Sequence, residues 1–143
     1  MKLSTRTRYG MRAIIELAQH ESKRPLQLKV IAERQDISVK YLEQLMSLLR
    51  SAGFVRSVRG SKGGYVLARP ADQIKLSEVF RCLEGPVTTA ECTEDDSYCG
   101  RSSDCAARQV WVRVEAAIQG VLGSITLSDL VRESKPSTTE YHI

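Results

Sequence analysis

The stretch 36–64 constrains the fold more than any other part of this 143-residue chain. Its first part predicts an amphipathic helix, because one apolar stripe recurs at helical spacing, namely Leu42, Leu45, Met46 and Leu49. Ser38 stands where a helix N-cap is expected, and Gly53 stands where the helix would end. The other side of this helix carries hydrogen-bonding side chains of the kind that reach base edges: Lys40, Tyr41, Glu43, Gln44 and Ser47.

Two β-rich runs follow at once, at 54–59 and 65–68, and a glycine-rich segment separates them. This pattern predicts a β-hairpin. Arg59 and Lys62 lie at its tip, as suits a hairpin that rests on the DNA backbone or in the minor groove. A polar-faced helix followed by a basic hairpin is typical of a winged helix-turn-helix. The alternative is an ordinary amphipathic helix beside an ordinary hairpin.

The charge is divided unevenly along the chain. Residues 1–69 hold 14 Lys/Arg against 5 Asp/Glu, whereas residues 70–143 hold 7 against 12. The basic half therefore coincides with the expected helix and hairpin, which favours contact with phosphates. Arg6, Arg8 and Arg12 line one side of the expected first helix, where phosphate contacts and a solvated surface are both open interpretations.

The sequence as a whole predicts a mainly α fold with a small β-hairpin wing. Besides the central helix, hydrophobic periodicity predicts helices over 5–20, 28–34, 77–84, 104–122 and 127–133. We expect three parts: a winged helix-turn-helix DNA-binding domain at 1–69, a cysteine loop with dimerisation helices at 70–133, and a disordered polar tail at 134–143.

The helix expected at 104–122 is long and apolar for so small a module. Its stripe comprises Val110, Trp111, Val114, Ala117, Ile118, Val121 and Leu122. Such a helix needs a partner surface, and a homodimer with crossed helices would suit a two-fold DNA site. The alternative is that the helix packs back on its own domain.

No apolar run approaches the length of a membrane span, and residues 2–17 lack the apolar core of a signal peptide. We therefore expect a cytoplasmic protein with no membrane partner. In a cytoplasmic protein, the four cysteines are not expected to form structural disulfides. Cys82 falls inside the helix expected at 77–84, where we expect a buried small hydrophobe.

The other cysteines are Cys92, Cys99 and Cys105. The first two belong to a segment at 87–104 that lacks hydrophobic periodicity and predicts a loop, and Cys105 follows it directly. Zinc sites usually use closely paired cysteines, and this segment has none. The wider spacing suits an iron–sulfur cluster held by thiolates. The acidic neighbours, among them Glu91 and Asp95, disfavour thiolates, so a bound metal would be needed to keep all three deprotonated.

Several motifs together resemble a known family. They are Met1-Lys2-Leu3-Ser4 with Arg8-Tyr9-Gly10, Ile37-Ser38 with Tyr41-Leu42-Glu43-Gln44-Leu45, and Val58-Arg59-Gly60 with Gly63-Gly64-Tyr65. With the three-cysteine loop before a long helix, they are similar to the IscR-type winged-helix regulators of the Rrf family over about residues 1–133. The resemblance implies a dimeric DNA-binding transcription regulator, commonly a repressor, whose DNA preference is set by an iron–sulfur cluster.

Carried over by position, the resemblance places Ser38, Tyr41, Glu43 and Gln44 at the major groove and Arg59 at the minor groove, and it makes Cys92, Cys99 and Cys105 the cluster ligands. The helix and wing patterns add Arg8, Lys40 and Lys62 to the expected DNA-binding residues. IscR has a histidine three residues after its third cysteine, where this chain has Arg108. The fourth ligand stays open between Asp104, His20 of the partner subunit, a small molecule and none. The cluster is therefore undecided between 2Fe–2S and 4Fe–4S.

Other functions remain as alternatives. The same fold could be a cluster-free repressor that responds to thiol oxidation or sulfur metabolism, and a winged helix could bind another protein instead of DNA. A thiol or metal enzyme would need a base near the cysteines, whereas the two histidines, His20 and His142, lie far from them in sequence. We therefore do not expect an enzyme.

Overall fold

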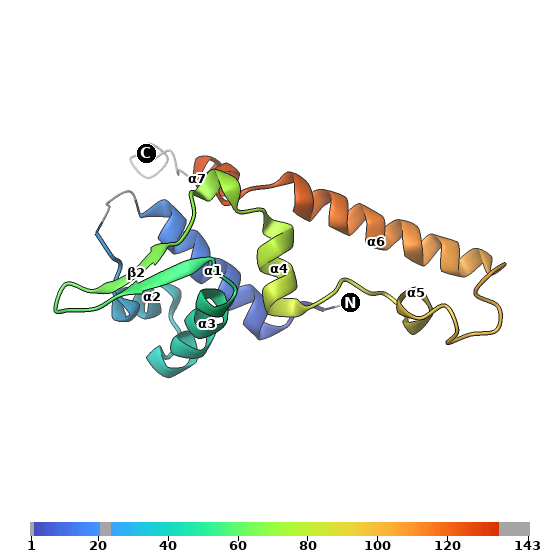
Figure 1. Cartoon of the computed structure of the whole chain (residues 1–143), viewed down its shortest axis with the longest axis horizontal. Helices are drawn as coiled ribbons and strands as arrows, with labels where there is room; N and C mark the ends of the chain where they lie inside the picture. The colour runs from blue at the N-terminus through green and yellow to red at the C-terminus, as the bar shows by residue number, and fades with distance from the viewer. Residues whose placement is uncertain (1, 21–23, 135–143) are drawn as a thin grey trace, which may run out of the picture.

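A computed structural model describes residues 2–20 and 24–134, and the tail expected to be disordered lies outside these residues except for Ser134. The fold is mainly helical with one two-stranded antiparallel hairpin (Figure 1), as the sequence predicts. The elements in chain order are α1 Thr5–Gln19, α2 Leu28–Gln35, α3 Val39–Ser51, β1 Val55–Val58, β2 Gly64–Leu67, a 3-10 turn Ala71–Gln73, α4 Leu76–Glu84, α5 Glu91–Glu94, α6 Ala106–Ser124 and α7 Leu127–Ser134.

A tight turn joins α2 to α3 and makes the helix-turn-helix. Asp36 adopts a left-handed conformation with φ 54°. The amides of Asp36 and Ile37 donate to the carbonyls of Glu33 and Ala32, a Schellman arrangement that ends α2. Ser38 then begins α3, since its side chain accepts from the Tyr41 amide at 3.1 Å. The N-cap expected from the sequence is confirmed.

The core gathers the apolar faces of α1, α3 and α4. The side chains that are fully or almost fully buried include Ala13, Ile14, Ile31, Leu42, Leu45, Met46, Leu49, Ile74, Val79, Leu83 and Leu127. Every member of the apolar stripe expected in α3 is buried. Because that stripe faces inward, the polar side of α3 faces outward.

The hairpin pairs Val55 with Leu67 and Val58 with Gly64. Gly64 has φ 155°, and a Cβ there would lie 2.4 Å from the Leu26 carbonyl oxygen. The close approach is real contact, since Leu26 and Tyr65 exchange backbone hydrogen bonds of 2.9 Å in both directions. The segment before α2 thus fastens the base of the wing.

The segment after the wing returns to the same core. The Leu76 amide donates to the Ile125 carbonyl, and the Leu127 amide donates to the Ile74 carbonyl. A capping box begins α7, in which the Thr126 amide donates to Asp129 and the Asp129 amide donates back to the Thr126 hydroxyl. The C-terminal helix is therefore part of the winged-helix body.

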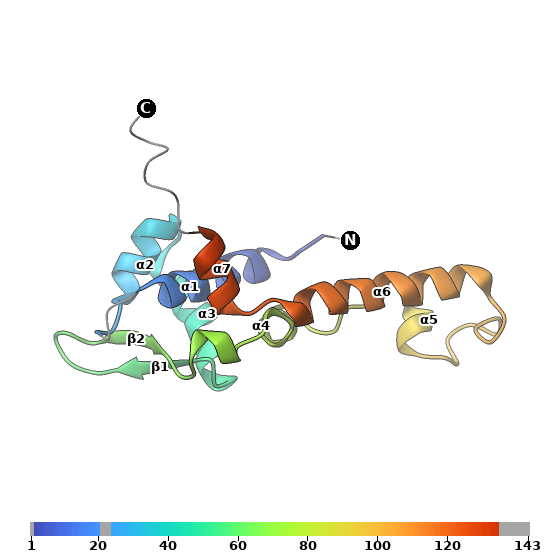
Figure 2. The same cartoon turned by 90° about the horizontal axis from the view of Figure 1, so that it is seen from above.

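In contrast, α6 extends away from this body, and α5 lies beside its far part in both views (Figures 1 and 2). No residue of α6 is buried. The segment 87–104 was expected to be a loop throughout, which is wrong for Glu91–Glu94, where the chain forms α5. Side chains of α6 contact α5, among them Glu115 and Arg108. The spacing of apolar residues within 87–104 does not reveal these contacts.

The Cys82 side chain is half-buried. Its thiol lies 3.7 Å from the Leu48 carbonyl oxygen of α3, and its side chain packs against the core. Burial raises the pKa of the Cys82 thiol, while the Arg6 charge acts weakly in the opposite direction. The expectation of a small packed side chain is correct, although the residue is less buried than expected.

A polar cluster joins the start of α1 to the end of α4. The Glu84 carboxylate accepts from the Ser4 amide at 3.2 Å, from the Ser4 hydroxyl at 2.5 Å and from the Thr7 hydroxyl. Beside it, Arg6 Nε donates to the Leu83 carbonyl at 2.8 Å. Thr7 is 2% exposed and Glu84 is half-buried, so the Thr7–Glu84 contact is partly shielded from water. We call Ser4, Thr7 and Glu84 the α1–α4 latch.

The latch predicts a pH-dependent contribution to stability. Hydrogen bonds from Ser4 and Thr7 hold the pKa of Glu84 below its usual value. A depressed pKa in the folded state stabilises the fold above the unfolded-state pKa, and this stabilisation is lost as pH falls through the folded-state pKa. We expect Glu84→Gln to lower the free energy of unfolding by about 1 kcal/mol near pH 7.

Urea denaturation of both proteins near pH 7 and near pH 4 would check this, with the difference between them shrinking at the lower pH. An equal difference at both pH values would show that the carboxylate charge has no part in the latch.

Candidate functional site

The exposed side of α3 lines an open groove of about 630 Å³. Its lining consists of Lys40, Tyr41, Glu43, Gln44, Leu45, Ser47 and Leu48 from α3 and Arg6 from α1. The stripe that faces the core and the polar row that lines the groove occupy opposite sides of one helix. The structure thus brings together four of the residues expected from the sequence to contact DNA: Lys40, Tyr41, Glu43 and Gln44.

Tyr41 is anchored as well as accessible. Its ring packs edge-to-face on Tyr9 of α1, with the ring centroids 6.3 Å apart and the planes at 84°. The guanidiniums of Arg8 and Arg12 lie 5.9 Å and 5.4 Å from the centroid of the Tyr9 ring. Arg12 also donates to Gln35 at 2.6 Å. Arg8 is exposed, and aromatic contacts hold this cationic edge next to α3.

Arg6 lines the groove, although it is not among the residues expected from the sequence to contact DNA. It forms part of the groove while its Nε is bonded to the Leu83 carbonyl. The sequence showed a row of arginines along α1. That pattern does not tell which of the arginines lies over the groove. Only the packing of α1 on α3 and α4 makes that distinction.

The wing presents its cations separately from the groove. Arg59 and Lys62 are both exposed on the turn between β1 and β2, and Ser38 is exposed at the start of α3. The Ser38 side chain already accepts a hydrogen bond as N-cap, so its hydroxyl hydrogen is what it can offer to another group.

The three cysteines of the segment lie at the far part of α6, away from α3 and the wing (Figure 2). Cys92 is half-buried in α5, Cys99 is exposed, and Cys105 is half-buried at the N-cap position of α6. Within residues 2–20 and 24–134, no three side chains of His, Cys, Asp or Glu converge into a metal-binding group. The three thiols thus lie on one segment, but their side chains do not converge into a metal-binding group.

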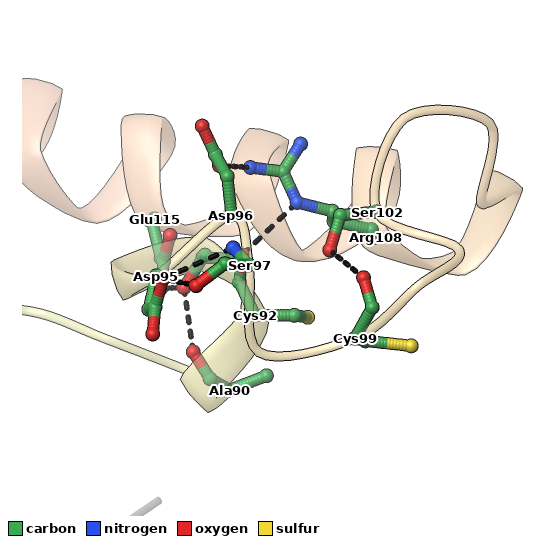
Figure 3. Close-up of polar contacts among 10 residues, drawn as sticks. Ala90, Cys92, Asp95, Asp96, Ser97, Cys99, Ser102, Arg108 and Glu115 are labelled. Carbon is green, nitrogen blue, oxygen red and sulfur yellow. Dashed lines mark hydrogen bonds and ion pairs between the residues drawn. The ribbon is translucent and has the colours of Figure 1, made fainter.

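Two side chains of α6 hold this segment (Figure 3). Glu115 accepts from the Thr89 amide at 2.6 Å and from the Thr93 hydroxyl at 2.7 Å. Arg108 donates through Nε to the Cys92 carbonyl at 3.1 Å and through Nη2 to the Asp96 carboxylate at 2.5 Å. The position that carries a histidine in the resemblance to IscR is thus occupied by a side chain that binds the loop backbone.

The apolar stripe of α6 is divided between two surroundings. Leu122 packs against the core, whereas much of the stripe is open to solvent. The large exposed side chains of α6 are Val110, Trp111, Val112, Val114 and Val121, between 41% and 58% exposed. Of these, Val110, Val114 and Val121 recur at helical spacing and share one side of α6, and exposed apolar side chains on one side of a projecting helix are characteristic of an interaction surface.

Among the described residues, no helix has the length and apolar character required to cross a membrane.

Fold and site together define a winged helix-turn-helix transcriptional regulator. Residues 3–133 match the family model described as "Rrf2: Iron-dependent Transcriptional regulator". The chain therefore belongs to the Rrf2 family. Since such regulators bind DNA through this fold, the sequence-based interpretation of a DNA-binding regulator is confirmed at this level.

The relatives agree with this assignment. The chain is 45% identical to the HTH-type transcriptional regulator CymR of Bacillus subtilis, over 91% of this chain and 89% of the relative. It is 42% identical to Protein rrf2 of Nitratidesulfovibrio vulgaris, over 94% and 89%. It is 38% identical to the HTH-type transcriptional regulator IscR of Xenorhabdus nematophila, over 94% and 82%.

Solved structures give the same result. CymR of B. subtilis, described as a global cysteine regulator, superposes with a TM-score of 0.82 at 42% identity, covering 94% of this chain and 99% of that one. T. potens IscR superposes with a TM-score of 0.78 at 40% identity, covering 96% and 91%. The family and the named regulators confirm the expectation that the chain is not an enzyme.

Proposed function

We propose that this chain is a dimeric, sequence-specific DNA-binding repressor whose DNA binding is modulated by an iron–sulfur cluster on Cys92, Cys99 and Cys105. The observation that carries the DNA-binding part is the polar groove of α3 with Arg6 at its edge and the basic wing beside it. Residues 1–69 would form the DNA-binding domain. Within residues 70–133, α4 and α7 complete the core of that domain, and α6 with the cysteine segment would supply the dimer surface and the sensing segment.

In this proposal α3 enters the major groove of a double-stranded operator. Gln44 can pair with adenine through its amide, and Glu43 can accept from the cytosine amino group. Lys40 and Tyr41 would contact the backbone or base edges beside them, and Ser38 would donate its hydroxyl hydrogen to a phosphate at the start of the helix.

Cations outside α3 would set the register on the duplex. Arg8 from α1 and Lys62 from the wing would contact phosphates, and Arg59 would reach the minor groove. Glu43 is the exception in this basic surface, because it repels phosphates while accepting from cytosine. We propose that Glu43 discriminates between classes of operator.

The dimer would form through α6. The exposed side chains of its stripe, among them Trp111 and Val114, lose their contact with water when two α6 helices cross. Removing this apolar surface from water favours association of the two helices. A two-fold axis through crossed α6 helices would also present two copies of α3 to a palindromic site.

The donor set fits an iron–sulfur cluster. Three thiols lie on one short segment outside the core, and thiolates are the usual protein ligands of such clusters. When bound, the cluster supplies a redox-active group whose gain or loss changes the charge and order of this segment. Because the segment lies far from α3 of its own chain (Figure 1), its effect on DNA binding would pass through the partner subunit.

A second candidate is a cluster-free repressor that responds to thiol oxidation or to sulfur metabolites. The similarity to CymR and the exposed side chain of Cys99 favour it, since an accessible cysteine is the first to react with an oxidant. The DNA-binding half of the proposal is common to both candidates.

For the DNA interface, Arg59→Ala is expected to weaken operator binding by about 1–3 kcal/mol if the side chain contacts bases. If it contacts phosphate alone, the salt slope of binding should fall by about one. Fluorescence anisotropy with operator and random duplexes at several salt concentrations would distinguish these outcomes. Arg113→Ala, at an exposed position of α6, is the control. Unchanged affinity at every salt concentration would remove the wing from the interface.

Glu43→Ala should change the ratio of affinities for two operator classes rather than affinity in general. Removing the carboxylate relieves its repulsion of phosphates and also removes the acceptor for cytosine. Binding to a panel of operators that differ at single base pairs would measure the ratio. If every operator kept the same affinity, Glu43 would not be a discriminator.

For the dimer, Val114→Asp should convert the protein to monomers, because it places a charge in the proposed α6–α6 contact. Ala116→Asp places the same charge on the other side of α6, where Ala116 is exposed, and should leave the dimer intact. Sedimentation velocity would give the mass of both variants. A dimer that persists in Val114→Asp would place the interface elsewhere.

For the cofactor, protein purified without oxygen should be brown and contain iron and acid-labile sulfide, and Cys92→Ala should lose both. The visible spectrum with iron and sulfide assays measures this. A protein that stays colourless after reconstitution would contradict the cluster and favour the thiol-responsive candidate.

A further inference from the structure

We infer that Arg108 and Glu115 of α6 form a clamp of two opposite charges that positions Cys92, and that Arg108 is the positioning residue of the sensing segment. The functional meaning of this clamp rests on the proposed cluster, but the clamp itself can be tested without it. Both side chains come from one helix, and both contact the segment on either side of α5 (Figure 3).

The first contact point lies at the start of α5. One oxygen of the Glu115 carboxylate accepts from the Thr89 amide at 2.6 Å, from the Thr89 hydroxyl at 3.3 Å and from the Thr93 hydroxyl at 2.7 Å. The Thr93 hydroxyl also lies 2.7 Å from the Ala90 carbonyl oxygen, so its single hydrogen is shared between this carbonyl and the Glu115 carboxylate. A carboxylate with three donors ties the residues before α5 to the residues within it.

The second contact joins Cys92, within α5, to Asp96, which follows the helix. The Arg108 side chain is 22% exposed. It bridges the Cys92 carbonyl at 3.1 Å and the Asp96 carboxylate at 2.5 Å. A planar guanidinium can contact two acceptors at fixed angles, so Arg108 fixes the backbone of Cys92 relative to the residue four positions later.

The spacing of the two charges explains why one helix can do this. Residues 108 and 115 are seven positions apart, which places them on the same side of α6 two turns from each other. The carboxylate accepts from residues before and within α5, whereas the guanidinium donates to the Cys92 carbonyl within α5 and to Asp96 beyond its end. A four-residue helix has no stability of its own, so it depends on these contacts.

The clamp gives Cys92 and Cys99 different degrees of freedom. Cys92 is half-buried and its carbonyl is held by Arg108, whereas Cys99 is exposed in the following turn, outside the clamp. Arginine does not lose its proton in proteins and cannot ligate a metal. Arg108 therefore acts on the cysteine segment through positioning and charge, without entering the ligand set.

The first experiment uses cluster-free, reduced protein and compares wild type with Arg108→Ala, Arg108→Lys and the control Arg113→Ala. Hydrogen–deuterium exchange of the peptide at 89–97 should be about tenfold faster in Arg108→Ala, as expected for losing hydrogen bonds to a charged group. Alkylation of Cys92 should accelerate with it, while alkylation of the exposed Cys99 stays the same. Arg113→Ala should match wild type.

Arg108→Lys separates positioning from charge. Lysine keeps the positive charge near Asp96 but lacks the fork that also reaches the Cys92 carbonyl, so exchange should recover only in part. Equal exchange in Arg108→Ala and Arg113→Ala would overturn the clamp. Complete exchange of this peptide in wild type at the earliest time would overturn it too.

The second experiment uses cluster-loaded protein. Removing a positive charge beside a ligand disfavours the more reduced, more negative cluster, so Arg108→Ala should lower the midpoint potential and Arg108→Lys should keep it near that of wild type. An unchanged potential in Arg108→Ala would contradict the charge effect. If wild type forms no cluster, the cluster part of the proposed function fails, and the exchange data alone decide whether the clamp exists.

Discussion

The burial of one stripe of α3 determines the orientation of everything that this molecule presents to DNA. Leu42, Leu45, Met46 and Leu49 are almost completely excluded from water. A helix can bury one side only by exposing the other, so the same packing that stabilises the domain aims Lys40, Glu43 and Gln44 outward. The turn at Asp36 and the cap at Ser38 set where this helix begins, and hence which residue occupies which position along the groove.

The winged-helix body and α6 differ in how far their side chains are buried. The winged-helix body has a closed core to which α4 and α7 also contribute, through Val79, Leu83 and Leu127. In contrast, α6 buries none of its residues and carries the cysteine segment at a distance from the body. A signal received on that segment has no short route to α3 within one chain, which is why a dimer is central to the proposed regulation.

Polar contacts connect these two parts and give them definite geometry. The α1–α4 latch ties the start of the winged helix to Glu84, just before the chain leaves for the cysteine segment. After the cysteine segment, Arg108 and Glu115 of α6 bind that segment through hydrogen bonds. In each contact a charged side chain binds neutral hydrogen-bonding groups, namely Ser4 and Thr7 at Glu84, Thr89 and Thr93 at Glu115, and the Cys92 carbonyl at Arg108. Loss of the charged side chain leaves these groups without that partner.

The sequence by itself determined the helices, the hairpin and the polar side of α3, because each follows from the spacing of neighbouring residues. Ser38 as N-cap, the α3 stripe and the glycine-rich wing needed only local patterns, and the motifs identified the family. Short-range patterns do not contain α5, the latch at Glu84, the place of Arg6 over the groove or the clamp at Arg108. In each of these, the partners are brought together by packing between segments far apart in the chain, up to 80 residues for Ser4 and Glu84, so only the tertiary structure decided them.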